Sequence, residues 1–339
     1  MNGVRRILAI LVVIGAAAPV AYARDALFAV DSRGTSAVAV GDSGRQLYSW
    51  PAPHNEAWYS APPYVPERFH SVTTTAGGYL AVGSGGRVMR SIDQQGYGTR
   101  WIPENSRTSR DLHGVTHAGD RIAAVGEGGV VLYKLSQSEG EWLQADPADV
   151  PTERTLRAVA GNPTYAVAVG DSGTVLWSRS SNLMAWEQVA SVAATEDFHG
   201  IGLGPGAPPG RFWAVGDEGV ILRSTPNVQE WDRLDSPTSV RLHDVAFSGT
   251  YGVAVGEAGT ILYSNGGQDW TAVDSGTSAD LYGVGYTGSG AGGGFVAVGD
   301  ANVILWSRFG NVWNDVVVGI EARSWGAIRS RWLSAPDEP

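Results

Sequence analysis

The chain has 339 residues and a formal net charge of −10, with 46 glycines, 13 tryptophans and no cysteine. The lack of cysteine excludes a disulfide scaffold, a thiol nucleophile and a Cys-ligated metal centre. The acidic balance argues against a nucleic-acid binder that depends on phosphate contacts. With 43% apolar residues the chain is expected to fold, and its glycine content predicts many turns between short strands.

Residues 1–23 are typical of a secretory signal peptide. Arg5 and Arg6 precede an apolar stretch over residues 7–18, and Ala21-Tyr22-Ala23 fits the cleavage pattern. The stretch is shorter than the ~20 residues that span a bilayer. We therefore expect cleavage and a soluble exported protein, periplasmic if the source is a diderm bacterium. An uncleaved membrane anchor is the alternative.

One sequence pattern then recurs seven times. Its core is Ala-Val-Gly, whose glycines are 40 to 46 residues apart: Gly41, Gly83, Gly126, Gly170, Gly216, Gly256 and Gly299. A tryptophan follows each glycine after 14 to 18 residues: Trp58, Trp101, Trp142, Trp186, Trp231, Trp270 and Trp313. A short apolar word such as Leu112-His113-Gly114-Val115 precedes each glycine. A period of this length indicates a repeat architecture.

Each repeat is predicted to hold four strands: the apolar word, the Ala-Val-Gly run, a segment such as 175–178, and the segment with the tryptophan. The second segment is apolar at successive positions, which suits a strand buried on both faces. Residues 24–319 are thus predicted to form an all-β, seven-bladed β-propeller of four-stranded antiparallel blades. We expect the recurrent tryptophans to be core. A two-sheet sandwich is the alternative fold, although it leaves the seven-fold period unexplained.

A tight turn follows each Ala-Val-Gly run, as in Gly170-Asp171-Ser172-Gly173. The last glycine of this turn predicts a positive φ, which lacks a Cβ clash at glycine. In the seventh repeat Asn302 takes that place, and asparagine tolerates the same conformation.

The two ends of the chain compete for one strand position. The segments 27–30 and 325–328 each have the spacing of an innermost strand. We expect 27–30 to fill the first blade and the tail, residues 320–339, to pack outside it or to reach a partner. The longer loops at 50–66, 202–210 and 285–294 are interpreted as tolerated insertions.

Two sets of residues are candidate partner-binding sites. The first occupies one position on the innermost strand and would line the channel: His70, His113, Arg157, His199, His243 and Tyr282, with Phe28 in the first repeat. Its histidines would make binding pH-sensitive near 6 to 7. Packing between blades is the alternative role. We expect no metal or other cofactor; of the histidines, just the pairs His70/His113 and His199/His243 could meet.

The second set forms an acidic ring on the turns: Asp42, Glu127, Asp171, Asp217, Glu257 and Asp300, with Ser84 in the second repeat. Such a ring would favour a positively charged partner patch. In the alternative, each acid accepts a backbone N–H of its own turn.

The run from Ala254 to Trp270 resembles the repeat of the photosystem II stability/assembly factor-like family, and the resemblance covers roughly residues 27–318. It implies a seven-bladed propeller of Asp-box (BNR-like) repeats. Members assist assembly of a membrane complex on its exported side, and some relatives look like accessory proteins of envelope transporters. The chain departs from the pattern where the Asp-box aspartate survives at most at Asp93 and where Lys134 replaces the third-strand serine.

We therefore expect a non-enzymatic scaffold or accessory factor for a membrane or envelope complex, as a soluble monomer or as one subunit of a hetero-complex. The alternative is a sialidase-like glycoside hydrolase or a glycan-binding propeller. Hydrolysis would need paired carboxylates or a tyrosine nucleophile. Asp111, Asp197 and Asp280 precede innermost strands but belong to separate blades, and no inward pair is evident.

Overall fold

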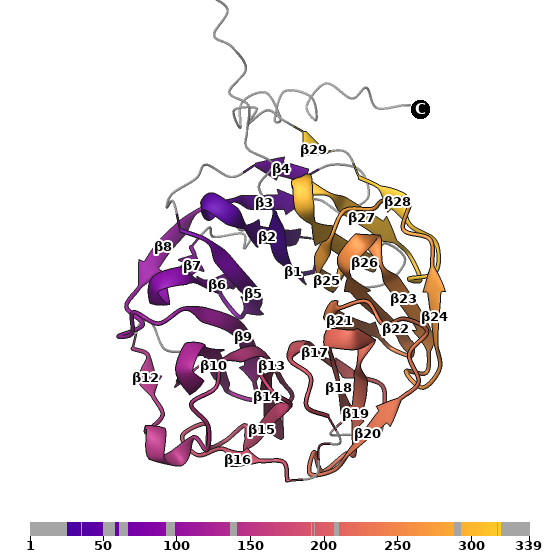
Figure 1. The fold of residues 1–339 in the computed structure, drawn as a ribbon. Helices are drawn as coiled ribbons and strands as arrows, with labels where there is room; N and C mark the ends of the chain where they lie inside the picture. The colour runs from indigo at the N-terminus through magenta and orange to yellow at the C-terminus, as the bar shows by residue number, and fades with distance from the viewer. Residues whose placement is uncertain are drawn as a thin grey trace, which may run out of the picture.

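Seven sheets, six of four strands and one of five, surround a central channel in the computed structural model (Figure 1). The structure describes residues 26–34, 36–49, 58–60, 67–92, 99–135, 141–190, 192, 194–206, 210–287, 293–316 and 318–319. The expected signal peptide, the tail and Asp93 lie outside these residues, as does most of the 50–66 loop. The seven-bladed propeller is confirmed, and the sandwich alternative is wrong.

Each blade runs antiparallel from the channel outward. The innermost strands are β1 (Leu27–Arg33), β5 (Phe69–Thr75), β9 (Leu112–Ala118), β13 (Leu156–Gly161), β17 (Phe198–Gly204), β21 (Leu242–Ser248) and β25 (Leu281–Thr287). The second strands are β2 (Ser36–Gly41), β6 (Gly78–Gly83), β10 (Arg121–Gly126), β14 (Tyr165–Gly170), β18 (Arg211–Gly216), β22 (Tyr251–Gly256) and β26 (Gly294–Gly299).

The third strands are β3 (Gln46–Ser49), β7 (Val88–Ser91), β11 (Val131–Leu135), β15 (Thr174–Arg179), β19 (Ile221–Ser224), β23 (Ile261–Asn265) and β27 (Ile304–Ser307). The outermost strands are β4 (Trp58–Ser60), β8 (Trp101–Glu104), β12 (Leu143–Gln144), β16 (Glu187–Gln188), β20 (Trp231–Leu234), β24 (Trp270–Val273) and β28 (Asn314–Asp315). In the third, fourth and seventh blades the recurrent tryptophan precedes the outermost strand by one residue, so its predicted place on the strand is wrong there.

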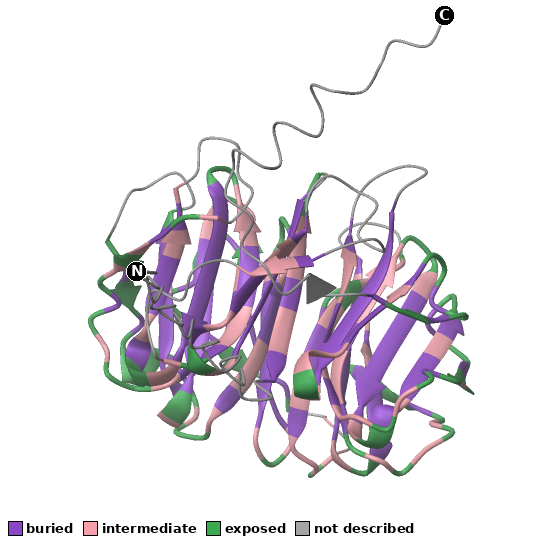
Figure 2. Ribbon diagram, turned by 90° about the horizontal axis from the view of Figure 1, so that it is seen from above, coloured by how far each residue is buried: buried purple, intermediate pink, exposed green. Residues whose placement is uncertain are grey.

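The second strands form the interior of the molecule. All six residues of β2, β6 and β26 are buried, as the unbroken apolar run predicted. Figure 2 shows buried strands running through the ring and exposed residues at its loops. The seven recurrent tryptophans are all buried, with exposed fractions between 0% and 9%. Each apolar cluster joins two adjacent blades, so burial between the sheets holds the ring together.

The glycine that ends each second strand allows a close approach of two backbones. A Cβ on Gly41 would lie 2.0 Å from the carbonyl oxygen of Ala26, and the six equivalent glycines meet the same obstacle at 2.0–2.1 Å. The amide of the next residue, Asp42, donates to that same oxygen at 2.9 Å. This contact explains why the Ala-Val-Gly glycine recurs in every repeat.

The turn after it contains two successive left-handed residues. Asn302 has φ 61°, and the glycines in its place have φ 68° to 72°, as predicted. The residue before it is also left-handed but need not be glycine, as at Glu218 with φ 54°. Six of these turns are labelled η1 (Asp42–Gly44), η2 (Ser84–Gly86), η3 (Glu127–Gly129), η5 (Asp217–Gly219), η6 (Glu257–Gly259) and η8 (Asp300–Asn302), and the left-handed residues make each of them non-helical. The sequence predicted the left-handed conformation at the last residue of the turn and did not predict it at the residue before.

Both ends of the described chain meet in the first blade. β1 pairs with β2, so the segment 27–30 fills the innermost position, as expected. β29 (Val318–Gly319) adds a fifth strand that runs parallel to β4 at the outer edge. The ring is therefore closed twice: through the apolar cluster shared by the first and seventh blades, and through this outer strand. No helix in the described part of the chain is long and apolar enough to cross a membrane.

Candidate functional site: the channel mouth

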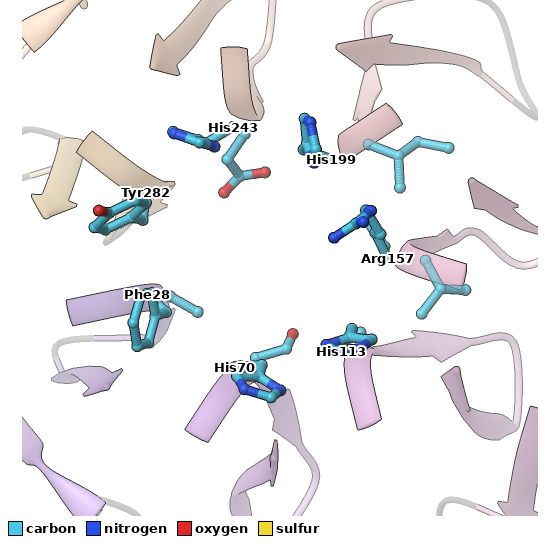
Figure 3. Close-up of a pocket in the computed structure, with 14 residues that line it drawn as sticks. Phe28, His70, His113, Arg157, His199, His243 and Tyr282 are labelled. Carbon is cyan, nitrogen blue, oxygen red and sulfur yellow. The ribbon is translucent and has the colours of Figure 1, made fainter. Parts of the chain in front are cut away.

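A β-bulge places one side chain of every blade in the channel mouth. In blade one Leu27 pairs with Gly41 and Ala29 with Val40, which leaves Phe28 as the extra residue. The same irregularity occurs at the equivalent point of the six other blades. A bulge bends its strand and redirects a side chain. The seven redirected residues, here called the collar, are Phe28, His70, His113, Arg157, His199, His243 and Tyr282 (Figure 3).

The collar residues contact one another around most of the ring. His70 stacks on His113 with ring centroids 4.9 Å apart, and His199 meets His243 edge-on at 5.9 Å. Both pairs are those that the sequence singled out. Tyr282 joins the two halves, because it lies 5.0 Å from His243 and 5.2 Å from Phe28. Arg157 is the non-aromatic member. It pairs with Asp171, and its Nε is 2.5 Å from Oδ1.

Burial favours the neutral form of the four collar histidines. Burial lowers the pKa of all four, and for His113 and His243 it falls to about 4. A neighbouring histidine lowers the pKa of His113 and His243 further, because two imidazolium ions would repel each other. The pH dependence expected near 6 to 7 thus stays a prediction, and burial moves the pKa values of these histidines below their ordinary value.

The acidic turn residues and the collar form one connected layer. Asp217 accepts from His199 Nε2 at 2.8 Å and from Arg241 Nε at 2.5 Å, and Asp42 pairs with Arg68 at 2.6 Å. In the second blade Ser84 takes the place of the acid, and its Oγ lies 3.4 Å from Nε2 of the collar residue His70. The hydrogen bonds of these acids thus go to innermost strands and adjoining loops. The alternative in which each acid holds its own turn does not describe them. Glu127 and Glu257 lie on η3 and η6 as expected.

The three aspartates that precede innermost strands hold neighbouring turns in place. Asp111 accepts from Gly85 N, Asp197 from Ser172 N and Asp280 from Ala258 N, at 2.7–2.8 Å. Each donor is the left-handed residue of the preceding blade's turn. These carboxylates therefore fix the shape of the channel rim rather than form a catalytic pair.

The pocket at the channel mouth contains a carboxylate that the sequence analysis did not select. Fourteen residues line a cavity of about 270 Å³; they include the whole collar and Asp244. Asp244 Oδ1 accepts from Val245 N at 2.8 Å and Oδ2 from Val284 N of the next blade at 3.0 Å. Although it keeps some surface on the channel, burial raises its pKa to about 7. The sequence did carry a signal, because the other repeats have Ala29, Ser71, Gly114, Ala158, Gly200 and Gly283 at that position.

A second buried carboxylate links the first two blades deeper in the channel. Asp31 accepts from Ser32 N at 2.7 Å and from Thr74 N of the next blade at 2.8 Å. Burial raises its pKa to about 6. Asp31 and Asp244 thus fasten one innermost strand to the next. Within the described residues, no three His, Asp or Glu side chains gather as a metal site would require.

Comparisons with known proteins place the fold. No family model matches the chain, and no curated protein matches it. Among solved structures, YCF48 from Cyanidioschyzon merolae superposes with a TM-score of 0.65 over 85% of this chain and 97% of its own. The fold is similar to that of YCF48. A structure described as YCF48 bound to D1 peptide has a TM-score of 0.64 over 84% of this chain and 93% of its own. Sequence identity is 18% in both cases, so the likeness concerns the fold.

Proposed function

We propose that this protein is a non-enzymatic exported scaffold that binds an extended segment of a membrane or envelope protein complex at the collar face. The observation that carries the proposal is the collar itself. Seven bulges point seven side chains into one pocket, and those side chains differ between blades. A rigid ring with a varied, half-buried mouth suits recognition of a partner. The structure of YCF48 bound to D1 peptide supports the idea, because it shows that a propeller of this fold can bind a peptide.

The pattern of residues 1–23 and the net charge support the proposed location and the proposed class of partner. The pattern of residues 1–23 supports export, to the periplasm in a diderm bacterium. A net charge of −10 supports a protein partner over nucleic acid. The protein partner would be an envelope transporter or a membrane complex during its assembly. We propose that the propeller binds it as a soluble monomer or as one subunit of a hetero-complex.

A sialidase-like hydrolase receives less support from the pocket. Such chemistry needs two carboxylates about 5–9.5 Å apart, or an activated tyrosine. Asp244 is the one carboxylate among the described residues that line the cavity. Burial raises the pKa of Tyr282 to about 12, which makes its hydroxyl a weaker nucleophile at neutral pH.

A pull-down from the native membrane fraction tests the scaffold function. The tagged full-length protein is used as bait, and a propeller variant that has lost its fold is used as the control for non-specific capture. Recovery of a defined membrane complex by the folded bait alone supports the proposal. Turnover of sialosides or other glycosides by the pure protein would overturn it.

A further inference from the structure

One sector of the pocket combines an aromatic wall with a carboxylate. The rings of Phe28, Tyr282 and His243 follow one another around three blades, at centroid distances of 5.2 and 5.0 Å. Asp244 follows His243 directly in the chain and lines the same cavity. Aromatic faces attract cations through their negative quadrupole, and a carboxylate attracts them through its charge. Both features favour the same kind of ligand.

The Asp244 carboxylate is held in a fixed orientation with acceptor capacity to spare. Each of its oxygens accepts one backbone N–H, from Val245 and from Val284. A carboxylate offers about four lone-pair sites, so two remain for a ligand. Since the two donors belong to adjacent blades, the group cannot turn away without breaking a contact between blades.

The charges around the mouth add to this preference. The arginines nearest the rim already have acidic partners: Arg68 pairs with Asp42, Arg157 with Asp171, and Arg241 with Asp217 and Glu257. Arg68 also lies over the Phe28 ring, 4.9 Å from its centroid, so a cation already occupies that end of the wall. At the Tyr282 and His243 end of the wall two acids lie close by. Asp280 accepts from Ala258 N, and Asp300 lies near the Tyr282 hydroxyl. The sector therefore carries an excess of negative charge, which favours a positive ligand.

Resting on the proposed function, we propose that this sector binds a basic side chain, Lys or Arg, of an extended partner segment. The cation would lie against the Tyr282 and His243 rings and pair with Asp244. The neutral histidines add surface without repelling it. A long side chain with a terminal charge matches a pocket that is lined by aromatic rings and by the Asp244 carboxylate.

Peptide binding measured by fluorescence anisotropy tests the proposal. The probe is a fluorescein-labelled Gly/Ser nonapeptide with a central lysine, and its control has norleucine, which keeps the hydrocarbon and lacks the charge. We expect the full-length protein to bind the lysine peptide at least tenfold more tightly. Asp244→Asn should abolish that preference. Asp120→Asn, which alters an exposed carboxylate on the hairpin between β9 and β10, should keep it.

The pH dependence provides a second readout. The lysine preference should increase between pH 6 and 8, where Asp244 ionises. Among the neighbouring groups, burial lowers the pKa of His199 and His243 and raises that of Tyr282. Hydrogen bonds within the His199–Asp217–Arg241 group lower the pKa of Asp217 and raise that of Arg241, and Asp280 and Asp300 are the other acids close to the sector. If Asp244→Asn fails to fold, Tyr282→Leu takes its place and should weaken lysine binding several-fold.

Equal binding of the norleucine peptide, or a lysine preference that survives Asp244→Asn, would overturn the proposal. The scaffold function fails separately. If the protein captures a membrane complex yet ignores lysine, the scaffold stands and the basic-side-chain proposal is wrong. If it prefers lysine yet captures no complex, the scaffold is the part that fails.

Discussion

The seven repeats are nearly alike between the blades and differ in the channel. The second strands carry small and branched apolar residues in every repeat, because each is buried against a sheet on both faces. The collar position holds phenylalanine, histidine, arginine or tyrosine. Its residues lie on bulges, outside the regular pairing of the strands. The comparison shows that burial between sheets restricts the second strands to apolar residues. The bulge position is free of that restriction, so its residue can differ from blade to blade and contribute to recognition.

A buried exception lies between the second and third blades. Lys134 replaces the serine of the other third strands, and its Nζ lies 2.6 Å from Glu104 Oε2 and 5.0 Å from the Trp142 ring centroid. Trp142 Nε1 and Arg90 Nε donate to the same carboxylate at 2.9 Å. In the fifth blade the serine at this position, Ser224, accepts a hydrogen bond from Phe212 N of the same blade. Charge can thus enter the interface between blades where a complete set of partners surrounds it.

The largest expected effect comes from removing a tryptophan between the blades. Trp231 is 6% exposed and donates from Nε1 to Val228 O at 3.1 Å. We expect Trp231→Ala to lower the free energy of unfolding by about 3–5 kcal/mol, because it leaves a cavity in a close-packed interface. Chemical denaturation measures the change. A midpoint that hardly moves would contradict the account of the blades.

Glu104→Gln should follow in size. It leaves the Lys134 ammonium, which is 3% exposed, without its counter-charge. We expect a loss of about 3 kcal/mol, at the lower end for a broken buried pair, since the glutamine oxygen still accepts from Trp142. The double variant with Lys134→Met should recover much of the loss. A double-mutant cycle in denaturant measures both, and simple additivity of the two changes would refute the pairing.

The turn position tests a smaller effect of backbone conformation. Asn302 has φ 61°. Replacing it by alanine should cost about 1 kcal/mol, because a Cβ without a compensating polar group is disfavoured there. Asn302→Gly should be close to neutral. Thermal unfolding of the two variants side by side decides the matter, and an alanine variant as stable as the glycine variant would contradict the left-handed turn.

Two sets of channel groups should make opposite contributions to the pH dependence of stability. The folded-state pKa of His243 is lowered to about 4, so its contribution is lost as pH falls from about 6.5 towards 4. The folded-state pKa of Asp244 is raised to about 7, so folding becomes more favourable as pH falls from about 7 towards 3.8. Each amounts to about 1–2 kcal/mol between pH 7 and 5 after allowance for solvent.

Asp244→Asn should therefore lose more stability than the native chain on acidification from pH 7 to 5, and His243→Phe should lose less. Urea midpoints at the two pH values give the comparison. If both variants lost more stability than the native chain, or both lost less, or if the two effects were exchanged, these groups would not titrate as the channel geometry requires.

The smallest expected effect on stability belongs to the collar. Tyr282→His gives the seventh blade the residue of the sixth, and we expect a change within about 0.5 kcal/mol, since the site is half-buried and outside the regular pairing. Capture of the membrane partner should weaken all the same. Thermal unfolding together with the pull-down separates the two effects, and a large loss of stability would mean that the collar is structural.

The sequence predicted the features that repetition makes visible. The blades, the buried tryptophans and the left-handed Asn302 each follow from a pattern seen seven times. The sequence did not reveal the bulges, because an extra residue in a strand depends on its pairing partner. The sequence also did not reveal the hydrogen bonds between the acidic turns and the collar, because partners such as Asp217 and His199 are 18 residues apart. Asp244 was overlooked because it breaks the pattern.

The most direct test of the central claim is hydrogen–deuterium exchange of the full-length protein, alone and with its captured membrane partner. We predict that protection on binding gathers on the first residues of the innermost strands and on the turns between second and third strands, such as η1 and η5, that surround the collar. The hairpins that join innermost to second strands, at the opposite end of the channel, should exchange as before. Protection confined to those hairpins or to the outermost strands would contradict the assignment of recognition to the channel mouth.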